Sequence, residues 1–107
     1  MSAERIAELN DAFRRSFSGG KVMMTAGIAA MSEDIRRQAL ERVRTFDAFT
    51  VDNDPHRERD FGSLEVAGKK VFWKIDYYDA AMEFGSEDPA DPTKTTRVIT
   101  IMLASEY

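Results

Sequence analysis

The sequence contains no cysteine, and this absence removes several kinds of chemistry at once. Disulfide bonds, thiolate nucleophiles, iron–sulfur clusters and cysteine-based zinc sites all need cysteine sulfur. Histidine is almost absent too, because His56 is the only one. A metal ion would have to bind oxygen atoms and His56. We therefore expect no cofactor other than a divalent cation held by carboxylates.

Long apolar runs are also missing. No segment approaches the roughly 18 apolar residues that cross a bilayer, and the N-terminal stretch MSAERIAELN lacks the apolar core of a secretory signal. We expect a cytoplasmic protein without membrane contact. With 107 residues the chain fits a single domain, residues 1–107, which can bury roughly two-thirds of the surface of its unfolded form.

Apolar residues at helical spacing predict two amphipathic helices in the N-terminal half. The first spans residues 3–17, and we expect its polar side to face solvent with an Asp11–Arg15 pair on it (Glu4, Glu8, Asp11, Arg14, Arg15). The second begins after Ser32, a good N-cap, and ends near Phe46. Between the helices, residues 22–26 predict a short strand.

The clearest pattern is a β-hairpin in FGSLEVAGKKVFWKIDYYD, residues 61–79. With Ala67 and Gly68 as the turn, Leu64 pairs with Val71 and Gly62 with Trp73. Gly62 then leaves room for the indole. Ala67 is the weak point of this register, because primed turns need a positive φ at their first position.

A further strand is predicted in the β-branched run TTRVITIML, residues 95–103. The complete pattern predicts an α+β fold. Two N-terminal amphipathic helices pack on one face of a three- to four-stranded, mainly antiparallel sheet that contains the hairpin at its centre.

The loop TVDNDPHRERDFG carries an acidic residue or histidine at every second position from 52 to 60. Such residues are metal ligands and acid–base groups, although Asp, Asn and Pro also form turns. The spacing resembles the start of a calcium-binding EF-hand loop. That match fails, because Gly is missing at the sixth place and Ser63 stands where the bidentate Glu belongs.

Acidic residues are concentrated in the second half of the chain, so that residues 1–46 carry a net charge of +2 and residues 47–107 of −6. No Lys or Arg occurs from Asp76 to Asp91. Because both strands of a hairpin share an end, we expect the loop before the hairpin to meet the segment after it. An acidic surface of this kind repels nucleic acid and attracts cations or basic proteins.

Three functions are compatible with these patterns. The one we favour is a non-enzymatic interaction protein that binds a protein partner through the acidic surface (Asp76, Asp79, Glu83, Glu87, Asp88, Asp91). A second is a metal-dependent or acid–base enzyme, with catalytic candidates His56, Glu58 and Asp60, and metal-ligand candidates Asp52, Asp54, His56 and Asp60. A third is nucleic-acid binding by the second helix, which the acidic balance disfavours (Arg36, Arg37, Arg42, Arg44). The pattern does not define an oligomeric state.

The strings RTFDAFTVDNDPHRERDFGSLEV, VFWKIDYYD, GSEDPADP and TTRVITIMLASEY resemble the bacterial domain-of-unknown-function family 3768. The resemblance implies a small proteobacterial protein associated with mobile genetic elements, and therefore an accessory of mobile DNA that inhibits a host defence or acts as a regulator. It supplies no catalytic residues. The family pattern has Gly at the place of Arg57 and His at that of Arg59, so this chain's loop is more basic and less suited to a metal.

Overall fold

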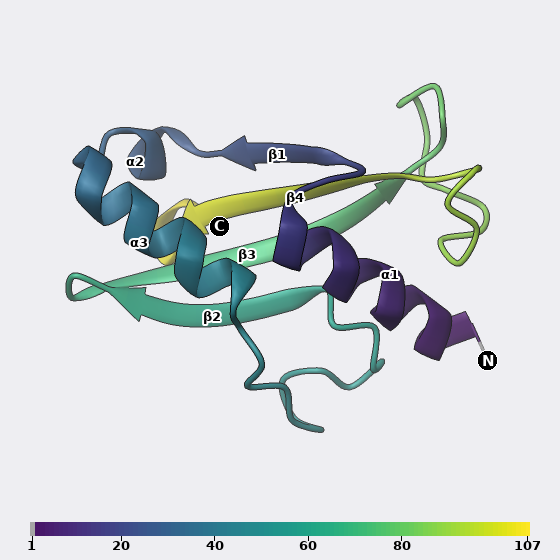
Figure 1. The fold of residues 1–107 in the computed structure, drawn as a ribbon, viewed down its shortest axis with the longest axis horizontal. Helices are drawn as coiled ribbons and strands as arrows, with labels where there is room; N and C mark the ends of the chain where they lie inside the picture. The colour runs from purple at the N-terminus through teal and green to yellow at the C-terminus, as the bar shows by residue number, and fades with distance from the viewer. Residues whose placement is uncertain (1) are drawn as a thin grey trace.

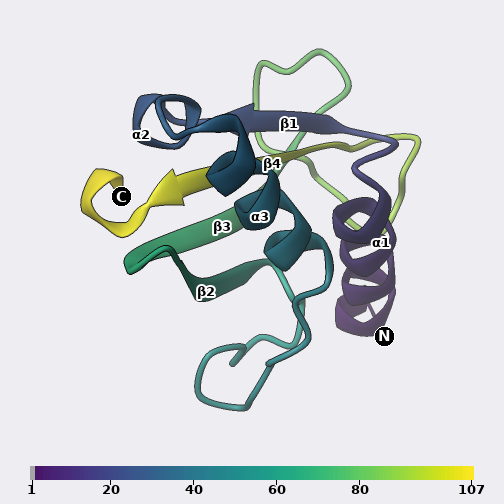
Figure 2. The same cartoon turned by 60° about the vertical axis from the view of Figure 1, so that its left-hand side comes forward.

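A computed structural model describes residues 2–107 as a four-stranded sheet with its long helices on one face (Figures 1 and 2). The elements follow one another as α1 (Ser2–Ser16), β1 (Lys21–Met24), α2 (Ala26–Ala29), α3 (Glu33–Arg44), β2 (Phe61–Val66), β3 (Lys69–Tyr78), β4 (Thr96–Leu103) and the 3₁₀ helix η1 (Ala104–Glu106). Within the described residues, no helix has the length and apolar character needed to cross a membrane.

The sheet has the strand order β1-β4-β3-β2. The hairpin of β2 and β3 therefore forms one side of the sheet and not its centre, because β4 lies between the hairpin and β1. β4 lies antiparallel to β3, and β3 antiparallel to β2, whereas β1 lies parallel to β4. The predicted α+β class with a mainly antiparallel sheet is confirmed. Two antiparallel steps make β2 parallel to β4, so β1 is parallel to β2 as well. The segment with α2 and α3 is the long crossover that two parallel strands need.

The hairpin has the predicted register, with Leu64 opposite Val71 and Gly62 opposite Trp73. Ala67 and Gly68 both have positive φ, 52° and 77°, as a two-residue primed turn requires. Ala67 therefore adopts the left-handed conformation that we identified as the weak point. The hydrogen-bonded strands β2 and β3 on either side of the turn hold Ala67 in this conformation.

The core lies between the sheet and the helices. Trp73 at the centre of β3 is fully buried and belongs to one apolar cluster that joins the three helices to the sheet (Phe13, Ile28, Val43, Val71, Trp73, Ile75, Ile99, Ile101). Phe46 and Phe49, in the loop after α3, place their ring edges against the indole at centroid distances of 5.6 and 6.1 Å.

The segment after β1 differs from the prediction, because the strand ends at Met24 and residues 26–29 form the short helix α2. The cause is a contact from the far end of the chain. The carboxylate of Glu106 accepts hydrogen bonds from the Thr25 hydroxyl and from the Gly27 backbone N–H, at 2.6 and 2.8 Å. An acidic group at this place satisfies N–H groups that a helix start leaves free.

The polar side of α1 also differs from the prediction, since two of its five residues, Asp11 and Arg14, are buried. Arg14 is 1% exposed and Asp11 8% exposed, and Asn10 between the two faces has no exposed surface. Asp11 pairs with Arg14 at 2.9 Å, whereas the predicted Asp11–Arg15 pair is longer, at 3.9 Å. Only Glu4, Glu8 and Arg15 keep the solvent exposure expected for this side.

Candidate functional site

The buried polar residues of α1 anchor the loop between α3 and β2, residues 45–60, to the sheet. The Asn10 amide donates to the Glu58 backbone carbonyl at 2.9 Å and to the Tyr77 hydroxyl at 2.8 Å. Its oxygen accepts from the Arg97 Nε at 2.6 Å. One fully buried amide thus joins α1, the loop, β3 and β4, and it uses both of its donors.

Tyr77 and Arg97 complete this network. The Tyr77 hydroxyl donates to the Glu58 carboxylate at 3.0 Å, and the Arg97 guanidinium lies 5.2 Å from the centroid of the Tyr77 ring. Burial raises the pKa of Tyr77 above its usual range and lowers that of Arg97. The phenol therefore stays protonated at physiological pH, where it can donate to Glu58 without acting as a base.

Arg14 and Arg59 form a second cluster around Asp11. Arg14 donates to the carbonyls of Val43 and Phe46 at 3.1 and 2.8 Å, so it holds the C-terminal end of α3. Its guanidinium lies 5.2 Å from the Trp73 ring centroid. Carbonyls, a carboxylate and an aromatic face together compensate the burial of this charge.

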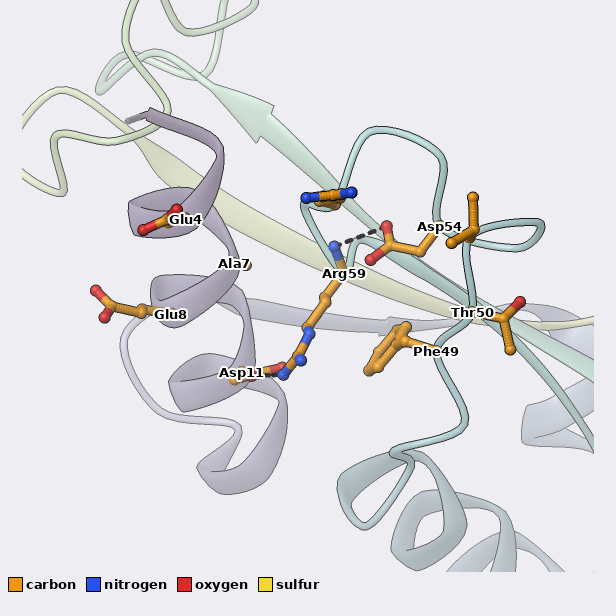
Figure 3. A pocket seen from close by; sticks show the side chains of 10 residues that line it. Glu4, Ala7, Glu8, Asp11, Phe49, Thr50, Asp54 and Arg59 are labelled. Carbon is orange, nitrogen blue, oxygen red and sulfur yellow. Dashed lines mark hydrogen bonds and ion pairs between the residues drawn. The ribbon is translucent and has the colours of Figure 1, made fainter.

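Arg59 crosses from the loop to α1, as Figure 3 shows, and forms one side of an open cleft of about 570 Å³. Its Nη1 lies 2.7 Å from the Asp11 carboxylate, and its guanidinium lies 5.3 Å from the centroid of the Phe49 ring. The cleft has an acidic wall on α1 with Glu4 and Glu8. The arginine that could bind an anion there is already paired with Asp11.

The predicted catalytic and metal-binding residues of the loop do not form one ligand set in the described part of the chain. Asp54 is 9% exposed, and its carboxylate accepts the Arg59 backbone N–H at 3.0 Å, whereas Asp52 and His56 are exposed on the turns. Across residues 2–107, no three His, Asp or Glu side chains come together as metal ligands would. Asp54 therefore acts here as a turn-forming residue, which was the alternative reading of DNDP.

The two acidic segments meet only in part. Glu58 reaches Tyr77 through its carboxylate, and the Asp60 carbonyl accepts the Ile75 N–H at 2.8 Å, so the loop does lie beside the end of β3. Asp76, on the other face of the sheet, pairs with Lys74 at 3.1 Å. The expected single acidic surface is therefore divided between the two faces of β3.

Asp60 is half-buried, and burial raises the pKa of its carboxyl, with the Glu58 and Asp54 carboxylates adding to the shift. A folded-state pKa above that of the unfolded chain means that the protonated carboxyl favours folding. This stabilisation is present below the ordinary value of 3.8 and is lost as the pH rises through the raised pKa.

We therefore expect Asp60→Asn to raise the melting temperature modestly at pH 7, and to leave it nearly unchanged below about pH 3.5, where both forms are neutral. Thermal unfolding followed by circular dichroism at several pH values measures this. Asp52→Asn, at an exposed position of the same loop, is the control and is expected to change nothing at either pH. An Asp60→Asn protein that is less stable at pH 7 would contradict the prediction.

The segment between β3 and β4, residues 79–95, is a loop braced by its own hydrogen bonds, and we call it the acidic loop. The Asp79 carboxylate accepts the Glu83 N–H at 3.0 Å, and the Asp91 carboxylate accepts the N–H and hydroxyl of Thr93 at 2.9 and 2.6 Å. These Thr93 bonds hold the pKa of Asp91 below its usual value. The hydroxyls of Ser86 and Thr95 are hydrogen-bonded to each other, and the Asp88 backbone carbonyl accepts the Thr95 hydroxyl. The Asp88 carboxylate accepts the Ala90 N–H.

The acidic loop presents Phe84, whose side chain is exposed. Phe84 has 70% of its surface exposed, next to Met82 at 38%. A shallow hollow of about 400 Å³ lies beside the ring and extends to Glu87 and Lys94. The composition showed the acidity of this segment, but the loop's bracing and the exposed aromatic were not predicted from the sequence.

The four arginines of α3 are engaged within the molecule. Arg36 donates to the carbonyls of Ala29 and Met31, and Arg37 pairs with Asp34 at 2.9 Å. Arg42 donates to the Glu65 carbonyl. Arg44 donates to the Arg15 carbonyl, and its guanidinium lies 5.7 Å from the Phe17 ring centroid. Arg36, Arg42 and Arg44 thus bind α3 to its neighbours, whereas Arg37 pairs within the helix.

The fold and these sites define a small α+β protein in which buried ionic groups bind its loops to a mixed sheet. Residues 24–106 match the family model described as Protein of unknown function (DUF3768), and the chain belongs to this family, as its sequence strings indicated. No curated protein and no solved structure matches the chain.

Proposed function

We propose that the protein is a non-enzymatic interaction protein, and that the acidic loop binds a protein partner through Phe84 with the Glu83 and Glu87 carboxylates around it. The exposure of Phe84 at the surface of a braced loop carries this proposal. Exposed aromatic residues in an ordered setting are typical anchors of protein interfaces, because they bury a large area at little cost in conformational entropy.

The hydrogen bonds of the loop divide its acidic residues into two groups. The carboxylates of Asp79, Asp88 and Asp91 accept N–H groups of the loop itself and so maintain its shape. Within the described residues, no hydrogen bond or ion pair uses the carboxylates of Glu83 and Glu87. The two glutamates are the acidic groups available to a partner. Because they are negatively charged, they favour a partner protein that has Lys or Arg around an apolar pocket for Phe84.

The proposed binding surface contains fewer acidic residues than the surface expected from the sequence. Asp76 pairs with Lys74 at 3.1 Å, so the proposed binding surface leaves it out. The enzymatic alternative lacks support in the geometry, because His56 is exposed, the Glu58 carboxylate accepts the Tyr77 hydroxyl and the Asp54 carboxylate accepts a backbone N–H. Buried and paired groups of this kind stabilise the loop.

The test is an affinity capture from the native host with three tagged baits: the natural protein, Phe84→Ser, and Val51→Ser as the control. Val51 is an equally apolar residue with 78% exposure in a different loop. We expect one or more proteins to be enriched by the natural bait and by Val51→Ser, and to be lost with Phe84→Ser. Loss of the aromatic anchor should weaken binding at least tenfold when the recovered protein is titrated.

Charge is tested with Glu83→Gln/Glu87→Gln, which should weaken the same interaction and make it less sensitive to salt. No enrichment above an unrelated bait would contradict the proposal. Retention by Phe84→Ser together with loss by Val51→Ser would place the binding surface on the other loop and would also contradict it.

A further inference from the structure

β1 is an edge strand of the sheet, and Figures 1 and 2 show no strand on its outer side. Every residue of β1 is exposed, and three of the four are apolar: Val22 has 37%, Met23 54% and Met24 41% of its surface exposed. An apolar edge strand with free backbone groups is a template for pairing with another strand. β1 carries no Pro, and its one charged residue is Lys21 at its start, so Val22, Met23 and Met24 form an uninterrupted apolar edge.

The hydrogen-bond pattern shows which backbone groups of β1 are directed outward. Thr25 continues the strand in extended conformation, and its N–H donates to the Ile101 carbonyl of β4 at 3.1 Å. In a parallel pair with this register, alternate residues bond to the neighbour, so Lys21, Met23 and Thr25 bond to β4. The N–H and C=O groups of Val22 and Met24 therefore point away from the sheet.

We propose that this edge pairs two copies of the chain, with the β1 strands antiparallel about a two-fold axis at Met23. In this register Val22 of each copy lies opposite Met24 of the other. These are the residues whose backbone groups point outward, so four hydrogen bonds form between the copies. The result is a continuous eight-stranded sheet with the helices of both copies on the same face.

Charge complementarity favours a second copy over an unrelated strand. In the same register Lys21 of one copy lies across from Thr25 of the other, on the face of the sheet without the long helices. The Thr25 hydroxyl is bonded to the Glu106 carboxylate at 2.6 Å. Each Lys21 ammonium thus comes beside the Glu106 of the other copy, and the two-fold axis makes two such pairs.

Glu106 is suited to this pairing, because its charge is held in place. It accepts the Thr25 hydroxyl and the backbone N–H groups of Gly27 and Leu103, and these bonds keep the pKa of its carboxyl below the usual value. At the axis the two Met23 side chains meet, and thioethers adapt to each other's shape. No like charges face each other in this register.

The absence of cysteine allows a direct test by single-cysteine cross-linking. The two Met23 positions form a non-hydrogen-bonded antiparallel pair, whose Cα atoms lie about 4.5 Å apart, close enough for a disulfide. Met23→Cys is expected to give a covalent dimer under mild oxidation. Val22→Cys is the matched control and should give little, because it lies opposite Met24.

Preferential cross-linking of Val22→Cys, or equal and slow cross-linking of both variants, would overturn the proposed pairing. A second measurement uses no cysteine. Sedimentation velocity of the natural protein should show a monomer–dimer equilibrium at roughly 10–100 μM, because a four-residue strand pair makes a small interface. A protein that stays monomeric at about 500 μM would overturn the dimer itself.

Lys21→Glu places a second negative charge beside Glu106 and should weaken the dimer about tenfold or more, in a salt-dependent manner. Arg5→Glu makes the same change of charge at an exposed position of α1 and should have no effect. Equal weakening by both variants would show a general charge effect and would contradict the Lys21–Glu106 contact. Circular dichroism of each variant verifies that the monomer fold is kept.

Discussion

Replacing Arg14 by methionine is expected to lower the free energy of unfolding by about 3–5 kcal/mol. Methionine keeps much of the side-chain volume but removes every donor. The carbonyls of Val43 and Phe46 would then be left in the interior without their present partners. Asp11 would keep only Arg59 and the distant Arg15.

Urea denaturation followed by circular dichroism and by Trp73 fluorescence measures this loss, since the indole lies against Arg14. Arg15→Met is the matched control, because Arg15 is the next residue of the same helix and its side chain is 62% exposed. It is expected to change stability by less than about 0.5 kcal/mol. Equal effects of the two substitutions would contradict the structural role assigned to Arg14.

Gly62→Ala is expected to destabilise the fold by about 2–3 kcal/mol through overpacking. Gly62 is directly opposite Trp73 in the hairpin, and a methyl group there would lie 2.6 Å from the Cε2 atom of the indole and closer still to Nε1. The indole cannot move aside, because it is fully buried between two phenylalanine rings and Arg14.

A double-mutant cycle with Trp73→Phe tests this reason. Phenylalanine lacks Nε1 and the second ring, so Gly62→Ala should cost much less in the Trp73→Phe background, and we expect a coupling of at least about 1 kcal/mol. The same packing explains why the Trp73 N–H has no hydrogen-bond partner among the described residues, because the indole nitrogen lies against Gly62. Purely additive effects would contradict direct packing of the two residues.

The proposed dimer and the proposed binding loop are independent of each other. The dimer rests on β1 and Glu106, whereas partner binding rests on Phe84, Glu83 and Glu87. A protein that is monomeric at every concentration could still bind its partner, and a dimer that captures nothing would leave the loop proposal alone contradicted. If both are correct, each dimer presents two acidic loops, and a multivalent partner would bind it more tightly than it binds one copy.

The hairpin was predicted residue by residue because its determinants are local. Side chains alternate between two faces, so a shift of one residue would expose Val71, Trp73 and Ile75 and bury Lys70 and Lys74. The two-residue turn fixes where the register starts. The two long helices, α1 and α3, were predicted within a few residues for the same kind of reason, namely an apolar stripe at a spacing of 3.6 residues and a capping serine at 32.

The candidate sites could be predicted only in part. The sequence located the acidic segment and excluded thiol chemistry, but a list of acidic residues does not say which carboxylates brace a loop and which are available. Asp79 and Glu83 look alike in the sequence. They differ in the structure because the turn brings the Glu83 N–H onto the Asp79 carboxylate.

The sequence by itself determined the α+β class, the hairpin register, the family and the excess of acid in the second half. Only the tertiary structure decided that Asn10, Asp11 and Arg14 are buried and that Glu106 starts a helix 80 positions earlier. The physical reason is the cost of removing a polar group from water, which depends on the partners that meet it inside. For Asn10 and Arg14 most of those partners are 29 or more residues away along the chain, so no local pattern contains them.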